Sequence, residues 1–415
     1  MRFLLALLVL LALLVAVSLP LGLLGMPVAP LSVIVLAAAL FPLARRVRLS
    51  EIVEEERWPR PVVLLARVAL VLAVALFLAK VAVAPLWSWD HFAIWGMKSR
   101  RMVVGGRLDL GFLALPGYEP SVTFYPVGLP MLWRLLALGG LPGTALFKTV
   151  HALSGLALVA VTRRGVLRLG RSPAMADALA ALLAASPLLW DTIAVGLADL
   201  PLALWATAGL VLALESAEGC PAWPAGLCLG FLPWLKQEGL SLAVLALAAA
   251  AVIAASGKNR RFRLAALLLP AVLLIAGALA VGRTLPQGGP SFFDGDWQGR
   301  ALARLSRPGE ILTLLGSDLA APDWLGFWFL FAAGLALALW WREPRQRTAL
   351  LLAGMVLLQL GLYAAVYFLT YLPPADHIRS SFTRIAAALV PLGILAIAAS
   401  GREMSNGWRI RAGME

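Results

Sequence analysis

The sequence contains few of the residues on which soluble enzymes and metalloproteins rely. Only 14% of its 415 residues are charged, and 22 acidic residues stand against 35 Lys and Arg. Its two cysteines, Cys220 and Cys228, share one apolar segment, which favours packing roles over a disulfide or a metal site. Three histidines, far apart in the chain, form no metal-ligand motif. We therefore predict no metal and no other cofactor.

The sequence is rich in apolar stretches of membrane-crossing length. Hydrophobic residues make up 61% of the chain and its mean hydropathy is +0.88, values that exclude an ordinary soluble globular protein. The pattern predicts an all-α, polytopic membrane protein with about twelve transmembrane helices, each needing roughly 20 apolar residues. They would form one domain, 1–400, followed by a short basic cytoplasmic tail, 401–415. The approximate helix ranges are 3–19, 27–43, 62–85, 143–162, 174–190, 200–215, 221–235, 239–256, 264–282, 322–341, 348–370 and 382–400.

The distribution of Lys and Arg predicts the orientation of these helices. With the N-terminus in the cytoplasm, three short inner loops are basic, with five, four and four such residues in 44–61, 163–173 and 257–263. The outer loops 20–26 and 191–199 hold none. Most of the excess positive charge behind the net charge of +13 is therefore interpreted as holding the inner loops in the cytoplasm, and we predict no nucleic-acid partner.

This orientation gathers the chemically distinctive loops on the outer face. The long ones are 86–142 and 283–321, and shorter turns carry further acids and bases. Within the first loop, residues 127–140 are apolar but too short to cross a bilayer. We expect them to lie along the membrane interface or to dip back into the protein. Charges collected at helix ends on one face predict a cavity that opens on that side.

Asp90 opens the first outer loop, where a long apolar run ends. It lies among Trp87, Trp89 and Trp95 and precedes Lys98. An ionisable group at the edge of the lipid is costly, and it is a functional candidate for that reason. The tryptophans have a simpler interpretation, because aromatic rings collect at membrane interfaces in many proteins.

Basic residues on the outer face form a second group of candidates. Lys236 lies in a turn between two apolar stretches, where it pairs with Glu238, reaches water, or binds an anion such as a lipid phosphate. Arg379 and Arg384 lie near the last stretch; a planar guanidinium suits phosphate, and contact with outer lipid headgroups is the alternative. Asp199 caps the helix that follows it, serves the site, or does both.

An acid beside water, with cations placed for a lipid-borne phosphate, fits one reaction class. The carboxylate accepts the proton of an acceptor hydroxyl or amide as that group attacks a sugar C1. Basic residues stabilise the departing phosphate as its charge develops. One carboxylate suffices for inversion, because a phosphate leaving group needs little protonation, unlike the leaving groups in glycoside hydrolysis.

Five short motifs on the outer face follow one another over about residues 85–390. They are Asp90 with Trp95 and Lys98, Phe124-Tyr125-Pro126-Val127-Gly128-Leu129-Pro130, Ala198-Asp199-Leu200-Pro201, Trp234-Leu235-Lys236-Gln237-Glu238-Gly239, and Asp376-His377-Ile378 with Ser381 and Arg384. Together they resemble the GT-C superfamily of membrane glycosyltransferases, which includes protein O-mannosyltransferases and the bacterial lipid A aminoarabinose transferase. The fifth motif is similar to an ending found in uncharacterised bacterial members. Val127 departs from the family's Tyr-Pro-Pro stretch, where a second proline stands.

The resemblance implies an inverting membrane glycosyltransferase of a bacterial inner membrane, with its site facing the periplasm. Its partners would be membrane lipids, a polyprenyl-phosphate-linked sugar as donor, and a lipid, glycan or protein as acceptor. No second acid follows Asp90 closely, so the resemblance carries no metal site. The implied roles are general base for Asp90 with Asp199 in support, donor phosphate binding for Lys236, Arg384 and Arg379, and substrate contact for Trp87, Trp95, Lys98, Tyr125, Glu238 and His377.

Two other classes stay open as alternatives. A twelve-span secondary transporter has the same number of helices, although the Asp90 loop has no second copy in the sequence. An O-antigen ligase or polymerase also uses a lipid-linked sugar, and it would depend on His377 and an outer arginine. Unlike the aminoarabinose transferase, the chain is expected to carry no soluble periplasmic domain, so loops 100–125 and 283–321 would select the acceptor.

Overall fold

The protein is a bundle of helices with one small hairpin in the part that the structure describes. The computed structural model describes residues 1–52, 56, 58–84, 90–104, 106–118, 122–138, 143–186, 196–256, 259–286, 295–340 and 346–401. Within them, the only strands are β1 (Val103–Val104) and β2 (Arg107–Leu108), which pair antiparallel. The predicted all-α class is confirmed.

The helices follow the apolar pattern of the sequence, with short helices in the predicted outer loops. The bounds are α1 (Arg2–Leu23), α2 (Pro30–Ala44), α3 (Arg60–Val83), the π-helix η1 (Asp90–Gly96), α4 (Met97–Arg101), the 3₁₀ helix η2 (Gly111–Ala114), α5 (Gly128–Ala137), α6 (Gly143–Arg168), α7 (Pro173–Ala185), α9 (Asp199–Ala217), α10 (Trp223–Gly230), α11 (Leu232–Leu235), α12 (Gly239–Ala255), α13 (Arg260–Thr284), α14 (Trp297–Leu305), α15 (Gly309–Leu319), the 3₁₀ helix η4 (Pro322–Trp324), α16 (Phe327–Trp340), α17 (Gln346–Leu369), α18 (Pro374–Ala387) and α19 (Val390–Ser400).

All twelve predicted stretches contain helix in the described residues. Six helices, α1, α3, α6, α9, α13 and α17, are long and apolar enough to cross a membrane. The pair α18 and α19 makes a seventh if it is one span, bent by 50°. Five shorter apolar helices fill the remaining stretches. The structure therefore supports a polytopic membrane fold, and the count of twelve crossings stays a prediction.

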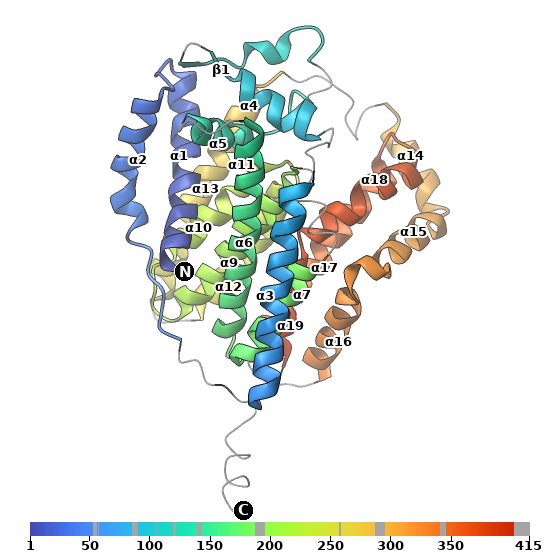
Figure 1. The fold of residues 1–415 in the computed structure, drawn as a ribbon. Coiled ribbons are helices and arrows are strands. Elements are labelled where there is room, and N and C mark those ends of the chain that lie inside the picture. Colours follow the sequence, from blue (N-terminus) through green and yellow to red (C-terminus); the bar gives the residue numbers. More distant parts are fainter. Residues whose placement is uncertain are drawn as a thin grey trace, which may run out of the picture.

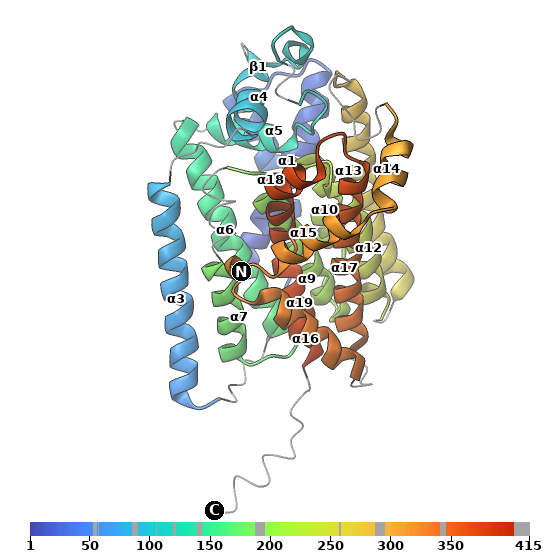
Figure 2. The same cartoon turned by 90° about the vertical axis from the view of Figure 1, so that its right-hand side faces the viewer.

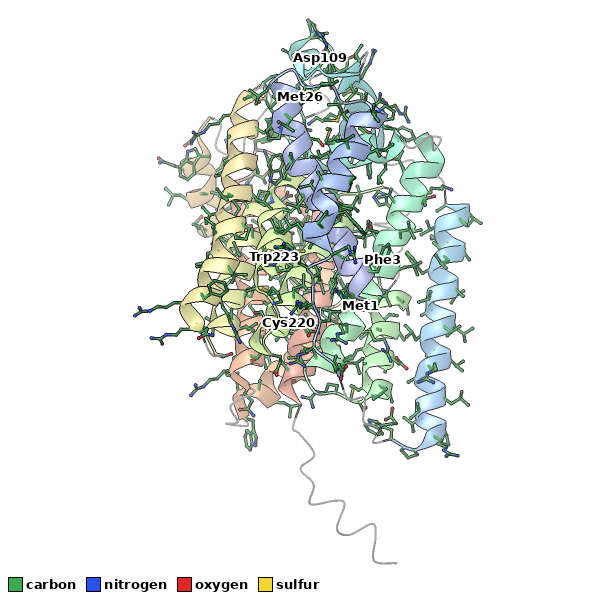
Figure 3. All side chains as sticks on the ribbon, turned by 90° about the vertical axis from the view of Figure 1, so that its left-hand side faces the viewer. Met1, Phe3, Met26, Asp109, Cys220 and Trp223 are labelled. Atoms are coloured by element: carbon green, nitrogen blue, oxygen red, sulfur yellow. The ribbon has the colours of Figure 1, made fainter. Side chains whose placement is uncertain are left out.

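Helix α9 forms the centre of the bundle, and 89% of its most apolar window is buried. It packs against α6, α10 and α12, whereas α3 lies at the outside against α7 (Figure 1). The elements of the first outer loop, α4, α5 and β1, gather at one end of the bundle, and α18 approaches that end from another side (Figure 2). Figure 3 shows Asp109 at this end and Cys220 towards the other.

Arginines at the opposite end join helices to one another. Arg164 lies 2.7 Å from the buried carboxylate of Glu215 on α9, which also accepts a hydrogen bond from the backbone N–H of Ser50. Arg163 on α6 lies 2.5 Å from Asp177 on α7. These arginines belong to loops that the sequence assigns to the cytoplasm. In addition to any effect on the orientation of the protein in the membrane, they neutralise acids that are buried between helices.

Two motif glycines allow close contact around the short helix α11. A Cβ atom on Gly128, the first residue of α5, would collide with the backbone carbonyl of Trp234. A Cβ atom on Gly239, the first residue of α12, would collide with the carbonyl of Leu232. Both collisions are with backbone, which cannot rotate away. The second and fourth sequence motifs therefore meet at a contact that only glycine permits.

We expect Gly128→Ala to lower the free energy of unfolding by about 1–3 kcal/mol, the usual cost of overpacking a tight contact. The matched control is Gly361→Ala in α17, where a Cβ would meet nothing within 4 Å. Alanine is the better helix former, so this control should be neutral or stabilising by up to about 1 kcal/mol. Thermal unfolding of both variants in one detergent makes the comparison. Equal stability of the two variants would contradict the tight contact.

Candidate functional site

Five of the residues singled out in the sequence form one connected network of charges. Arg384 on α18 donates a hydrogen bond to the carboxylate of Asp90 on η1, with Nη1 2.7 Å from Oδ2. The guanidinium Nε also lies 3.8 Å from Oδ2 of Asp199. The ammonium of Lys236 is 2.8 Å from Oδ1 of Asp199 and 3.3 Å from Oε1 of Glu238. Opposite charges thus alternate along the whole network.

Asp199 begins α9, and its carboxylate points to Lys236. The N-cap of α9 is Ala198, and no side chain caps the helix. The alternative interpretation of Asp199 as a helix cap is therefore wrong. A carboxylate in the first turn of a helix is favoured by the helix dipole, and here it gains the ammonium of Lys236 as well.

Lys236 is buried in an extended position between α11 and α12. It neither reaches water nor pairs with Glu238 alone, because Asp199 is its nearer partner. Burial by itself would lower the pKa of this ammonium, but the carboxylates of Asp199 and Glu238 more than offset that effect and raise the pKa. The two carboxylates therefore favour the charged form of Lys236.

The network has a buried centre and a partly exposed rim. The side chains of Asp199 and Lys236 are 3% and 4% exposed. Those of Asp90, Arg384 and Glu238 are 22%, 28% and 30% exposed. Only the rim residues can meet a ligand from outside without rearrangement. The described network holds three carboxylates and two cations, so each cation already has a carboxylate partner.

Trp95 and Tyr125 form an aromatic wall next to the network. Their rings stack with centroids 5.8 Å apart and planes 25° apart. Lys98 is fully buried, and its Nζ donates to the carbonyls of Val122 and Tyr125, at 2.9 and 3.1 Å. Burial lowers the pKa of Lys98 to about 7. Lys98 therefore positions the segment that carries Tyr125. Trp87 and Trp89 lie outside the described residues.

His91 ties η1 to the turn before Asp199, a role that the sequence analysis missed. Its ring packs edge-on against Phe147, with centroids 4.7 Å apart, and a Cβ on Gly196 would lie 2.7 Å from its Nδ1. His151 on α6 extends this link, since its ring nitrogens lie 2.8 and 3.2 Å from the carbonyls of Phe147 and Leu197. Both histidines are buried. Their isolated positions in the sequence gave no sign of this contact.

His377 and Arg379 lie on α18, away from the network's direct contacts. His377 makes a hydrogen bond of 3.0 Å to Thr370 Oγ1, and its ring packs edge-on against Tyr367. Arg379 is exposed and precedes Arg384 by five residues, so the two arginines point to different faces of the helix. Among the described residues, no three His, Cys, Asp or Glu side chains lie together as metal ligands. The expectation of no metal stays a prediction.

Comparison of the sequence with protein-family models and with curated proteins gives no match. Among solved structures, the fold is similar to ArnT from Cupriavidus metallidurans bound to undecaprenyl phosphate, with a TM-score of 0.49 and 20% identity over 84% of this chain. The chain spans 62% of the length of ArnT.

Two structures of the Archaeoglobus fulgidus oligosaccharyltransferase, one with zinc and sulfate and one in the apo form, are also similar. Each has a TM-score of 0.35, with 16% and 15% identity over 81% and 82% of this chain and 54% and 57% of theirs. ArnT and the oligosaccharyltransferase are both GT-C membrane glycosyltransferases, the class that the motifs resemble. At such TM-scores and identities, chemistry has to be argued from this chain's own residues.

We expect the free energy of unfolding to fall as the pH falls from about 6.5 to about 4, because of His91. Burial, with smaller contributions from His151 and Arg100, lowers the pKa of His91 from 6.5 to about 4. The unfolded chain therefore binds more protons in this window, and acid favours unfolding, by about 3 kcal/mol at most. His91→Phe should remove the part of this loss that His91 contributes between pH 6.5 and 5, before carboxylates titrate, while His377, whose pKa burial also lowers, remains in the variant. An unchanged pH profile in the variant would refute this role for His91.

We expect Lys236→Met to destabilise the fold by about 3–5 kcal/mol, because it leaves Asp199 buried without its nearest cation. Adding Asp199→Asn should recover part of the loss, since a neutral amide is cheaper to bury than a lone carboxylate. Lys148→Met is the control: within the described residues this lysine donates to the carbonyl of Ala82 at an exposed position, so the loss should be about 1 kcal/mol or less. Thermal unfolding of the four proteins decides between a structural pair and independent side chains.

Proposed function

We propose that the protein is an inverting membrane glycosyltransferase of a bacterial inner membrane. It moves a sugar from a polyprenyl-phosphate donor to an acceptor at the outer face. The observation that supports this most is the pair of Asp90 and Arg384 at the exposed rim of the network. A carboxylate for an acceptor proton and a guanidinium for a phosphate lie side by side there, as transfer from a sugar phosphate requires.

Asp90 is the general base of the proposed reaction. An acceptor hydroxyl or amide attacks C1 of the sugar and gives its proton to Asp90 as the new bond to C1 forms. The bond between C1 and the phosphate oxygen breaks with inversion, and its electron pair leaves with the polyprenyl phosphate. The guanidinium of Arg384 stabilises the developing charge.

Arg384 has to change partners for this reaction to proceed. In the structure its guanidinium donates a hydrogen bond to the carboxylate of Asp90, the group that would take the acceptor proton. A phosphate at the rim would compete for the guanidinium and leave Asp90 available to the acceptor. Lys236 is buried behind two carboxylates, so its charge supports this arrangement without meeting the phosphate directly. Asp199 holds Lys236 in place.

The remaining candidates line the site in this proposal. Tyr125, backed by Trp95, offers a ring surface to the sugar, and Lys98 fixes the position of Tyr125 without touching substrate. His377, whose ring packs against Tyr367, lines another part of the site. Exposed Arg379 meets outer lipid headgroups or the approaching donor. A lipid, glycan or protein acceptor would enter between the outer loops.

We expect Asp90→Asn to reduce sugar transfer by about 10²–10⁴-fold, because the amide cannot take the acceptor proton. Binding of the lipid donor should persist, since Arg384 is retained. The assay compares the variant with wild type in membranes at matched expression, following consumption of a polyprenyl-phosphate sugar and appearance of a glycosylated envelope product.

Asp323→Asn serves as the control for this substitution, because Asp323 is an exposed acid on η4, outside the network. It should transfer sugar at the wild-type rate. Full activity of Asp90→Asn would remove Asp90 from the mechanism and shift the proposal to a ligase that depends on His377. A wild-type protein that consumes no such donor would favour the transporter.

A further inference from the structure

Two polar atoms at the rim of the network are buried without a hydrogen-bond partner among the described residues. One is Oε2 of Glu238 and the other is Nε of Arg384. The first is an acceptor and the second a donor. A buried carboxylate oxygen that makes no hydrogen bond is costly and therefore uncommon in folded proteins. An acceptor and a donor without partners in one partly exposed network indicate that a ligand supplies their missing hydrogen bonds.

Glu238 has one oxygen committed and one uncommitted. Its Oε1 lies 3.3 Å from the ammonium of Lys236, and this contact holds the carboxylate in place. The side chain is 30% exposed although Oε2 itself is buried, so a small rotation of the carboxylate would bring Oε2 to a ligand at the rim. A carboxylate accepts hydrogen bonds and repels phosphate, so Oε2 suits a neutral donor such as a hydroxyl. The phosphate, in contrast, suits Arg384.

Tyr125 places an aromatic ring near this carboxylate. Burial raises the pKa of the Tyr125 hydroxyl, and the charge of Glu238 is the next largest cause. One side of the Tyr125 ring packs on Trp95. A carboxylate acceptor beside a rigid ring can fix a sugar through one hydroxyl and one ring contact, as a few placed polar groups do in apolar sites.

We propose that Glu238 is the specificity-determining residue for the donor's sugar, accepting a hydrogen bond from a sugar hydroxyl at Oε2. This inference rests on the proposed function and adds a second subsite to it. Arg384 binds the phosphate, and Glu238 binds the sugar away from C1. In the order of ion-pair contacts, the buried pair of Asp199 and Lys236 stands between the two subsites.

The order of charges in the network agrees with the order of groups in a glycosyl phosphate. Asp90 lies at the Arg384 end, so the base stands next to the phosphate and therefore next to C1, where the acceptor attacks. Glu238 lies at the other end, where the hydroxyls remote from C1 would reach. A lipid phosphate without a sugar would use the Arg384 end alone.

The test measures the affinity added by the sugar. Full-length protein in lipid nanodiscs is titrated with undecaprenyl phosphate and with undecaprenyl phosphates that carry glucose, galactose or mannose. We expect wild type to bind at least one glycosylated probe more tightly than the bare one. Glu238→Gln should reduce this ratio of affinities by about tenfold to a hundredfold, the usual worth of a hydrogen bond to a charged group. The affinity for the bare probe should change far less.

Two further variants keep the outcome interpretable. Glu310→Gln makes the same change at an exposed acid on α15 and should preserve the ratio. Glu238→Asp keeps the charge beside Lys236 but withdraws the oxygen by one methylene, so it should lower the ratio even if Glu238→Gln folds poorly. A ratio unchanged in both Glu238 variants, or equal binding of all four probes by wild type, overturns the inference. Failure of wild type to bind bare undecaprenyl phosphate overturns the proposed function itself.

Discussion

The arrangement of the site depends on the buried ion pair between Asp199 and Lys236. Taking a lysine out of water is expensive, and the cost is offset here by a carboxylate at 2.8 Å and a second at 3.3 Å. The pair holds the start of α9, the central helix, against the turn between α11 and α12. Asp90 and Arg384 join the network at its outer edge, so the exposed charges are held by a contact that water does not reach.

Much of the fold was readable from composition, whereas the pairing of side chains was not. Apolar runs of membrane-crossing length predicted the helices because burial in lipid demands that pattern whatever the tertiary contacts. The same sequence named Asp90, Asp199, Lys236 and Glu238 as site residues through short motifs. It could not say which would pair, because Asp90 and Arg384 are 294 residues apart and spacing carries no information on such contacts.

Several roles were decided by contacts that only the folded chain reveals. Lys98 resembles a substrate ligand in sequence, yet its ammonium donates to two backbone carbonyls. Asp199 reads as a helix cap, yet its carboxylate turns to Lys236. His91 stood out from no motif, although its ring joins η1 to the turn at Gly196. In each case the residue type was informative, and the partner came from another helix.

The distance along the chain between partners has a consequence for biosynthesis. Lys236 follows Asp199 by 37 residues, so the buried pair can form soon after its two helices leave the translocation machinery. Arg384 follows Asp90 by 294 residues, so the rim is completed only after α18 has been synthesised. In a growing chain, Asp90 is therefore present for a long interval before Arg384, its ion-pair partner, has been synthesised. The rim of the network is therefore incomplete in a nascent chain until its final helices arrive.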